Sequence, residues 1–149
     1  MLRVGLTITA AIAAASPVPA SVQRAIPKEV PAHLRYVPTE VPTGYRYVKW
    51  HGARSGLEID FARRGWPPTL AFLAQRSGPP GTCGPGGTHP YRFGSVRVSF
   101  ERDRYIEQFW RCTRARTVTV AATIRRTDVV TPAKRRAIAA MVASATPLG

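Results

Sequence analysis

The sequence contains few of the side chains that hold metal ions or nucleotides. It has three histidines and two cysteines, and the histidines show no paired spacing such as H-E-x-x-H. The glycine-rich segment from Ser77 to Pro90 lacks the G-K-[ST] ending of a phosphate-binding P-loop. We therefore expect no cofactor, and no metal site at His33, His51 or His89.

Motifs for covalent catalysis are also incomplete. The segment Gly52-Ala53-Arg54-Ser55-Gly56 is displaced from the G-x-S-x-G pattern of a nucleophile elbow, so Ser55 is interpreted as a turn residue. Cys83 is followed six residues later by His89, but a thiol–imidazole pair is defined by contact in space. No catalytic residue is assigned, and a small hydrolase that uses Cys83 or Ser55 is kept as an alternative.

Glu58 and Asp60 are two carboxylates on one face of an expected strand, about 7 Å apart. The paired carboxylates of glycosidases come from separate elements on either side of a cleft. We expect Glu58 and Asp60 instead to pair with nearby arginines at the solvent.

No hydrophobic run is long enough to cross a membrane. The uncharged stretch from Val4 to Ala15 follows Arg3 and falls short of the roughly 20 residues that a spanning helix needs. With the small residues of Val18-Pro19-Ala20 behind it, this pattern predicts a signal peptide over residues 1–20, cleaved after Ala15 or Ala20. No cysteine lies nearby to carry a lipid anchor, so we expect a secreted or extracytoplasmic protein with no membrane span after cleavage.

The two cysteines, Cys83 and Cys112, are an even number in a small exported chain, which predicts a disulfide. Closing a ring of about 30 residues would stabilise the fold by roughly 3 to 4 kcal/mol. Six prolines lie between residues 17 and 43, and they indicate a Pro-rich linker over residues 21–35. A single disulfide-stapled domain is expected over residues 36–149.

Short runs of aromatic and β-branched residues follow from Tyr45 onward, separated by turn signals typical of antiparallel sheet. The clearest run alternates Leu57, Ile59 and Phe61 with the two carboxylates. Six or seven strands result, over residues 45–51, 57–61, 69–75, 91–93, 96–100, 105–112 and 116–124.

The end of the chain changes to a helical period. Thr131 is a candidate N-cap and Pro132 suits the first helical position. The apolar residues that recur on one helix face are Ala137, Ile138, Met141, Val142 and Ala145. The expected fold is therefore α+β, an antiparallel meander with one C-terminal helix packed on its apolar face, and a closed barrel is the alternative.

Acidic residues are scarce: the chain has 22 Lys and Arg but only 8 Asp and Glu, which gives a net charge of +14. Such a field attracts polyanions, although 19 of the 22 basic residues are Arg, a bias that GC-rich codon usage also produces. A solvated, non-functional charge is thus the competing interpretation. The candidate anion-binding residues crowd two strands and their turns: Arg102, Arg104, Arg111, Arg114, Arg116, Arg125 and Arg126.

Aromatic residues lie among these arginines, at Tyr105, Phe109 and Trp110. Exposed aromatics beside Arg are typical of surfaces that bind single-stranded nucleic acid, but alternate aromatics in a strand belong more often to a core. Lys134, Arg135 and Arg136 fall in the first helical turn, where the helix dipole disfavours cations, and are weaker candidates for an anion-facing cluster.

Three segments together resemble small exported proteins of high-GC Gram-positive bacteria: Pro42-Thr43-Gly44-Tyr45-Arg46-Tyr47, Phe109-Trp110-Arg111-Cys112 and Met141-Val142-Ala143-Ser144-Ala145. The resemblance implies an export signal and a C-terminal helix, and no activity that carries over to any residue. We therefore expect a non-enzymatic domain that binds or interacts at the bacterial cell envelope through its Arg-rich surface. The candidate partners of such a domain are an anionic envelope polymer and a protein. The alternative function is that of a cationic binder of polyanions, which are nucleic acid, a cell-wall phosphate polymer or an anionic lipid.

Overall fold

The computed structural model describes residues 16–77, 88–113 and 117–149. Along the chain the elements are α1 (Ala20–Ala25), η1 (Ile26–Lys28), η2 (Ala32–Leu34), β1 (Tyr36–Val37), β2 (Tyr45–Ala53), β3 (Gly56–Arg63), β4 (Leu70–Arg76), β5 (Thr88–Phe93), β6 (Val96–Arg102), β7 (Ile106–Cys112), β8 (Val118–Arg125), α2 (Pro132–Ser144) and β9 (Thr146–Pro147). The α+β class and the antiparallel sheet are confirmed.

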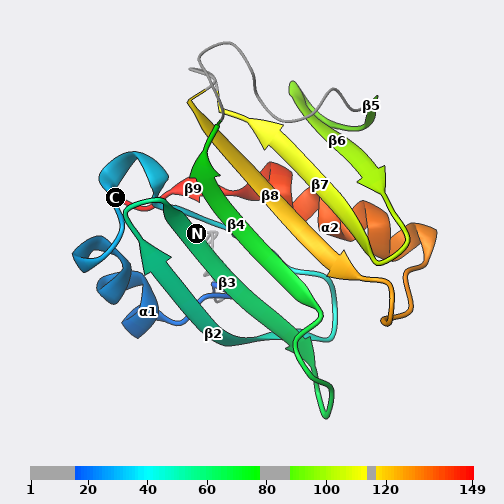
Figure 1. The fold of residues 1–149 in the computed structure, drawn as a ribbon, viewed down its shortest axis with the longest axis horizontal. Helices are drawn as coiled ribbons and strands as arrows, with labels where there is room; N and C mark the ends of the chain where they lie inside the picture. The colour runs from blue at the N-terminus through cyan, green and yellow to red at the C-terminus, as the bar shows by residue number, and fades with distance from the viewer. Residues whose placement is uncertain (1–15, 78–87, 114–116) are drawn as a thin grey trace, which may run out of the picture.

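Seven strands form one antiparallel sheet in the order β2-β3-β4-β8-β7-β6-β5 (Figure 1). The meander is present as two runs of neighbouring strands, β2 to β4 and β5 to β8. They meet where β4 pairs with β8 over seven residues, from Leu70 opposite Ile124 to Arg76 opposite Val118. The two remaining short strands, β1 and β9, pair with each other. The sheet is open, with β2 and β5 at its edges, so the alternative of a closed barrel is wrong.

One face of the sheet carries the core. Leu57, Ile59 and Phe61 of β3 point to this face, as their alternation predicts, and all three are buried. Helix α2 covers the half formed by β5 to β8. Its predicted start is confirmed, because the Thr131 hydroxyl accepts a hydrogen bond from the Lys134 N–H at 3.2 Å and Pro132 is the first helical residue.

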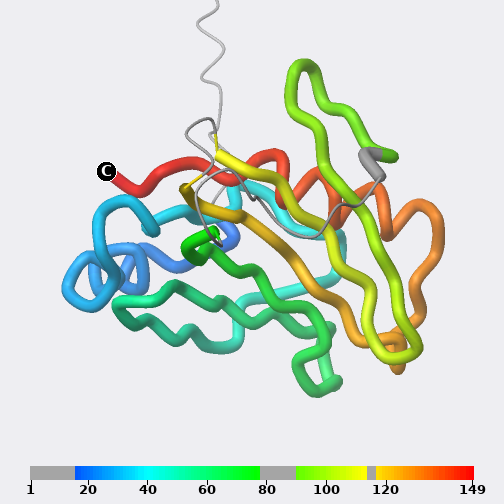
Figure 2. The backbone as a smooth tube through the Cα atoms, turned by 45° about the horizontal axis from the view of Figure 1, so that its top comes forward, coloured from blue at the N-terminus to red at the C-terminus, as the bar shows by residue number. Residues whose placement is uncertain are grey.

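The segment before β1 covers the other half of the core face (Figure 2). The expected linker over residues 21–35 is therefore wrong, and so is a domain that begins at residue 36. Instead α1, η1 and η2 pack their apolar side chains into the core cluster. These buried residues recur at every fourth position: Val18, Val22, Ile26, Val30 and Leu34.

That spacing of four is a helical signal, which the prolines concealed. Pro27 stands in the first turn of η1, where its missing N–H costs no hydrogen bond. Pro31 precedes η2 as its N-cap and accepts a hydrogen bond from the Leu34 N–H. Arg35 then fixes the segment, because its guanidinium donates to the carbonyl oxygens of Val30 at 2.8 Å and of Pro27 at 3.0 Å.

The other face of the sheet, here called the open face, looks toward the viewer in Figure 1, and no described helix lies on it. Cross-strand pairs place Lys49, Asp60, Ala71, Thr123 and Gln108 in one row across it. Within the described residues no helix is both long and apolar enough to span a bilayer.

Candidate anion-binding site

Three chain connections meet at one end of the sheet. They are the turn between β3 and β4, the turn between β6 and β7, and the stretch from β8 to α2. The Arg126 N–H donates to the Tyr105 carbonyl at 2.8 Å, and the Arg125 N–H donates to the Thr69 carbonyl at 2.9 Å. These bonds hold the three connections together as one surface.

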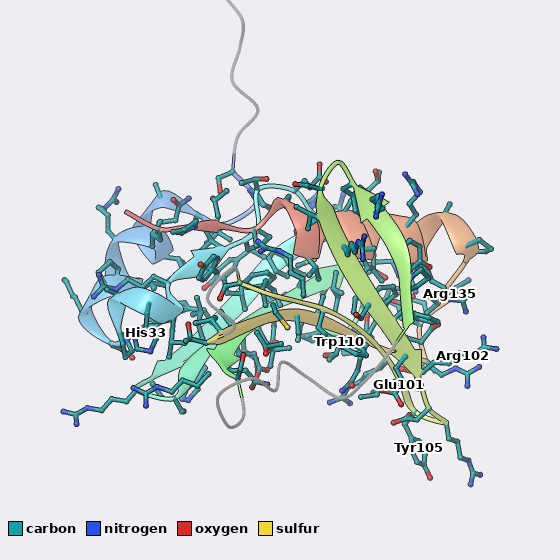
Figure 3. All side chains as sticks on the ribbon, turned by 90° about the horizontal axis from the view of Figure 1, so that it is seen from above. His33, Glu101, Arg102, Tyr105, Trp110 and Arg135 are labelled. Carbon is teal, nitrogen blue, oxygen red and sulfur yellow. The ribbon has the colours of Figure 1, made fainter. Side chains whose placement is uncertain are left out.

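Exposed arginines lie at this end of the sheet, in or beside the three connections, and we call this end the arginine tip. Its members are Arg64, Arg102, Arg104, Arg125 and Arg126. Four of the seven predicted arginines are thus brought together. Figure 3 shows Arg102 and Tyr105 projecting from this end of the sheet. Arg64 was missed, although Arg63-Arg64-Gly65-Trp66 carries the same signal of basic and aromatic residues in a turn.

An acidic residue of the tip, Asp103, is engaged by the backbone. Its Oδ1 accepts hydrogen bonds from the N–H groups of Tyr105 at 2.6 Å and Ile106 at 2.9 Å. These bonds lower the pKa of Asp103, with a smaller contribution from the Arg126 charge. The carboxylate therefore shapes the turn that presents Arg104.

Two aromatic rings at this end of the molecule reach the solvent. Tyr105 is 70% exposed, and the Arg104 guanidinium lies 5.6 Å from its ring centroid. Trp66 is 47% exposed, with the Arg63 guanidinium 3.8 Å from its ring centroid. Of the three aromatics weighed for stacking, only Tyr105 is available, because Phe109 and Trp110 are buried.

Arg111 is a correction to the predicted site. It lies on the helix side of β7, where Nε donates to the Val142 carbonyl at 2.9 Å and Nη2 donates to the Ala145 carbonyl at 2.7 Å. These carbonyls lie at the end of α2, where the Val142 carbonyl also accepts the N–H of the C-cap residue Ala145 at 3.4 Å. Arg111 therefore caps this end of the helix. Burial lowers the pKa of Arg111. The predicted Arg114 and Arg116 lie outside the described residues.

A buried carboxylate, Asp128, links the elements that meet at this end of the sheet. Oδ2 accepts hydrogen bonds from the hydroxyl groups of Tyr45 at 2.5 Å and Thr69 at 2.7 Å. Oδ1 lies 2.7 Å from Nη2 of Arg63 and 3.4 Å from Nζ of Lys134. Strands β2 and β3, the residue just before β4 and helix α2 are thereby joined to the loop that follows β8.

The environment of Asp128 keeps it ionised. Burial alone would raise the pKa of this carboxyl, but the hydrogen bonds from Tyr45, Thr69 and the Val129 N–H, with the Lys134 charge, hold it well below its usual value. Burial and the bond to Asp128 raise the pKa of Tyr45 in turn. The ring hydroxyl therefore stays a hydrogen-bond donor at neutral pH.

Two of the three cations in the first turn of α2 are paired with buried carboxylates, which explains their place near the positive end of the helix dipole. Lys134 reaches Asp128 and the Val129 carbonyl. Arg135 Nε lies 2.6 Å from Oε1 of Glu107, a fully buried carboxylate on β7. Lys134 and Arg135 thus each form an ion pair with a buried carboxylate. Of the three cations, Arg136 alone is exposed.

The described residues show no catalytic arrangement around Ser55, the described one of the two candidate nucleophiles. Ser55 is an exposed residue of the two-residue turn between β2 and β3, and in the described part of the chain it forms no hydrogen bond to His51 or Glu58, which line the same hollow. Cys83 lies outside the described residues. Over residues 16–77, 88–113 and 117–149, no group of three or more His, Cys, Asp or Glu side chains is placed to hold a metal ion.

Glu58 and Asp60 do share the open face, but their expected pairing with arginine is wrong. Asp60 Oδ2 lies 3.8 Å from Nζ of Lys49. Arg125 lines the same groove of the open face as these two carboxylates, but among the described side chains it forms no ion pair with either of them.

Comparisons with protein-family models, with curated proteins and with solved structures found no match to this chain.

Proposed function

We propose that this protein is an exported, non-enzymatic binding domain of the bacterial cell envelope that contacts an anionic polymer through the arginine tip. The observation that carries the proposal is the gathering of Arg64, Arg102, Arg104, Arg125 and Arg126, all exposed, at one end of the sheet. In the sequence, the candidate arginines are distributed over two strands and their turns. The fold concentrates four of them.

The tip suits a polymer that bears phosphate or sulfate groups. A guanidinium donates two parallel hydrogen bonds to such a group, and several guanidinium groups on one surface engage successive groups along a chain. The net charge of +14 draws the polymer toward the molecule from a distance. Each contact releases counterions, so the affinity should fall steeply as salt rises.

The test compares two variants that lose the same charge. The tip variant carries Arg102→Gln, Arg104→Gln, Arg125→Gln and Arg126→Gln. The control variant removes four exposed arginines from the opposite end of the strands, through Arg54→Gln, Arg76→Gln, Arg92→Gln and Arg97→Gln. The probes are heparin and a fluorescein-labelled single-stranded oligonucleotide, and the measurement is affinity at several salt concentrations.

We expect the tip variant to bind at least about tenfold more weakly, with the slope of log K against log salt smaller by about 3, since a single-stranded polyanion loses about 0.7 per contact. The control variant should keep most of its affinity and slope. Equal losses in the two variants would mean that net charge alone drives binding, and absent or salt-independent binding by the native protein would end the proposal.

Export and a disulfide between Cys83 and Cys112 are part of the same proposal. Cys112 ends β7, and the described residues include no free cysteine. Cys83 lies outside them, so the bond itself stays a prediction. The resemblance to small exported proteins and the uncharged stretch after Arg3 also support export.

A further inference from the structure

A polar groove lies on the open face, beside the tip. It has a volume of about 510 Å³ and crosses strands β3, β4 and β8. Its polar walls include Glu58 and Asp60 on one side and Thr123 and Arg125 on the other. A smaller hollow of about 190 Å³ continues it along β3 and β4, and the two share Glu58. The combined depression is therefore elongated.

The depth of the groove comes from a short side chain on β4. Ala71 stands opposite Asp60 on one neighbouring strand and opposite Thr123 on the other. Adjacent strands lie about 4.8 Å apart, so a methyl group between two longer side chains leaves a trough. Ala71 is thus the floor of the groove, and Asp60 and Thr123 are its rims.

The groove is electrically balanced, unlike the rest of the molecule. Two cations, Lys49 and Arg125, and two carboxylates, Glu58 and Asp60, line it. The close pair in this set is Lys49 with Asp60 at 3.8 Å, and the Lys49 side chain is 70% exposed. Burial and the neighbouring Asp60 charge raise the pKa of Glu58. Among the described residues Glu58 has no ion-pair partner, which is consistent with that direction.

We propose that this groove binds a neutral, hydroxyl-rich ligand, an oligosaccharide of two or more linked sugar units. Each sugar hydroxyl both donates and accepts a hydrogen bond, so it matches carboxylates, a threonine hydroxyl and cationic donors set side by side. An anionic ligand would be repelled by Glu58 and Asp60, and a polyamine by Lys49 and Arg125. The volume falls in the range of about 300 to 1,000 Å³ that small-molecule sites occupy.

The site is separate from the tip except at Arg125, which borders both. A free oligosaccharide and a sugar chain of an envelope polymer present the same hydroxyl chemistry to the groove. The proposal does not require that the tip bind an anion, and the experiment therefore leaves every tip arginine in place in the groove variants.

The experiment is an NMR titration of the ¹⁵N-labelled exported protein with neutral disaccharides, maltose and N,N′-diacetylchitobiose, beside spermidine and inorganic pyrophosphate as ionic probes. We expect a disaccharide to shift the amide signals of Glu58, Ala71 and Thr123 and to leave those of the tip residue Tyr105 unchanged. The tip variant described above, with Arg125 restored, should bind the sugar with unchanged affinity.

Ala71→Leu fills the floor without changing charge and should weaken sugar binding at least tenfold, whereas Ala133→Leu on the exposed start of α2 should not. Glu58→Gln keeps the shape of the groove and is the second variant if Ala71→Leu fails to fold. We expect it to lower the affinity for the disaccharide several-fold. Three results would overturn the proposal: no sugar shifts these amides, spermidine or pyrophosphate shifts them as strongly, or both groove variants bind sugar as the native protein does.

Discussion

At the scale of single residues, Asp128 joins parts of the chain that are distant in sequence. One carboxylate oxygen accepts hydrogen bonds from hydroxyl groups of β2 and of the residue just before β4, and the other lies close to cations of β3 and α2. Removing one partner of a buried, hydrogen-bonded ion pair leaves the other charges buried without compensation. The carboxylate therefore matters more to the fold than its exposed counterparts do.

Replacing this carboxylate gives the first prediction. Asp128→Asn should lower the free energy of unfolding by about 3 to 5 kcal/mol at neutral pH. Because the folded-state pKa of Asp128 is depressed, its contribution is complete above the ordinary aspartate pKa of about 4 and is lost as the pH falls through the lower folded value. The gap between native protein and variant should thus narrow in acid.

Urea unfolding at about pH 7 and about pH 3 measures that gap. Glu40→Gln, which changes an exposed carboxylate outside the network, is the control and should give a difference near zero at both. A gap for Asp128→Asn that is equally large at both pH values would contradict the assignment of an ionised Asp128.

The same pairings limit what the sequence can reveal about the site. Arg102, Arg104, Arg125 and Arg126 were identified from local crowding, because turns next to strands expose long charged side chains. Arg111 was misassigned because its partners are carbonyl groups of a helix that lies far along the chain. Charge alone does not distinguish an arginine that caps a helix from one that faces solvent.

At the scale of elements, the strands and α2 were predictable because their signals are local. Alternation of Leu57, Ile59 and Phe61 with polar residues is complete within one strand, and the cap of α2 is contained in two residues, Thr131 and Pro132. The pairing of β4 with β8 is different, since it brings together two strands that are separated in sequence by β5, β6 and β7. No property of either strand alone selects that neighbour.

The segment before β1 shows how one signal hides another. The prolines predict a linker, whereas apolar residues at every fourth position indicate a packed helical segment. The burial of those apolar residues shows that the segment is packed. Ile26 lies at the centre of that segment and is fully buried. We predict that Ile26→Ala destabilises the domain by about 2 to 5 kcal/mol, the usual cost of a large-to-small change in a core.

Equilibrium unfolding in urea checks this value. Arg24→Ala, on the exposed side of the neighbouring α1, is the matched control and should change stability by less than about 0.5 kcal/mol. If Ile26→Ala were as mild as the control, the segment would not be part of the folded unit.

At the scale of the whole molecule, the packing of the N-terminal segment bears on where an export signal would be cut. Val18 is 1% exposed within the core cluster. The Pro19 carbonyl accepts hydrogen bonds from the N–H groups of Val22 at 3.0 Å and Gln23 at 3.1 Å, which begin α1. Cleavage after Ala20 would remove both residues, whereas cleavage after Ala15 keeps them.

We therefore predict that the exported protein begins at Ser16, and that its mass rises by two hydrogens on reduction as the bond between Cys83 and Cys112 opens. Mass spectrometry of the secreted product, with and without reductant, tests both points together. A start at Ser21 would contradict the argument from Val18 and Pro19, because the product would lack a core side chain and the first acceptor of α1. An intact chain recovered from the cytosol with both thiols free would contradict export, and the arginine tip would then need an intracellular anion as its partner.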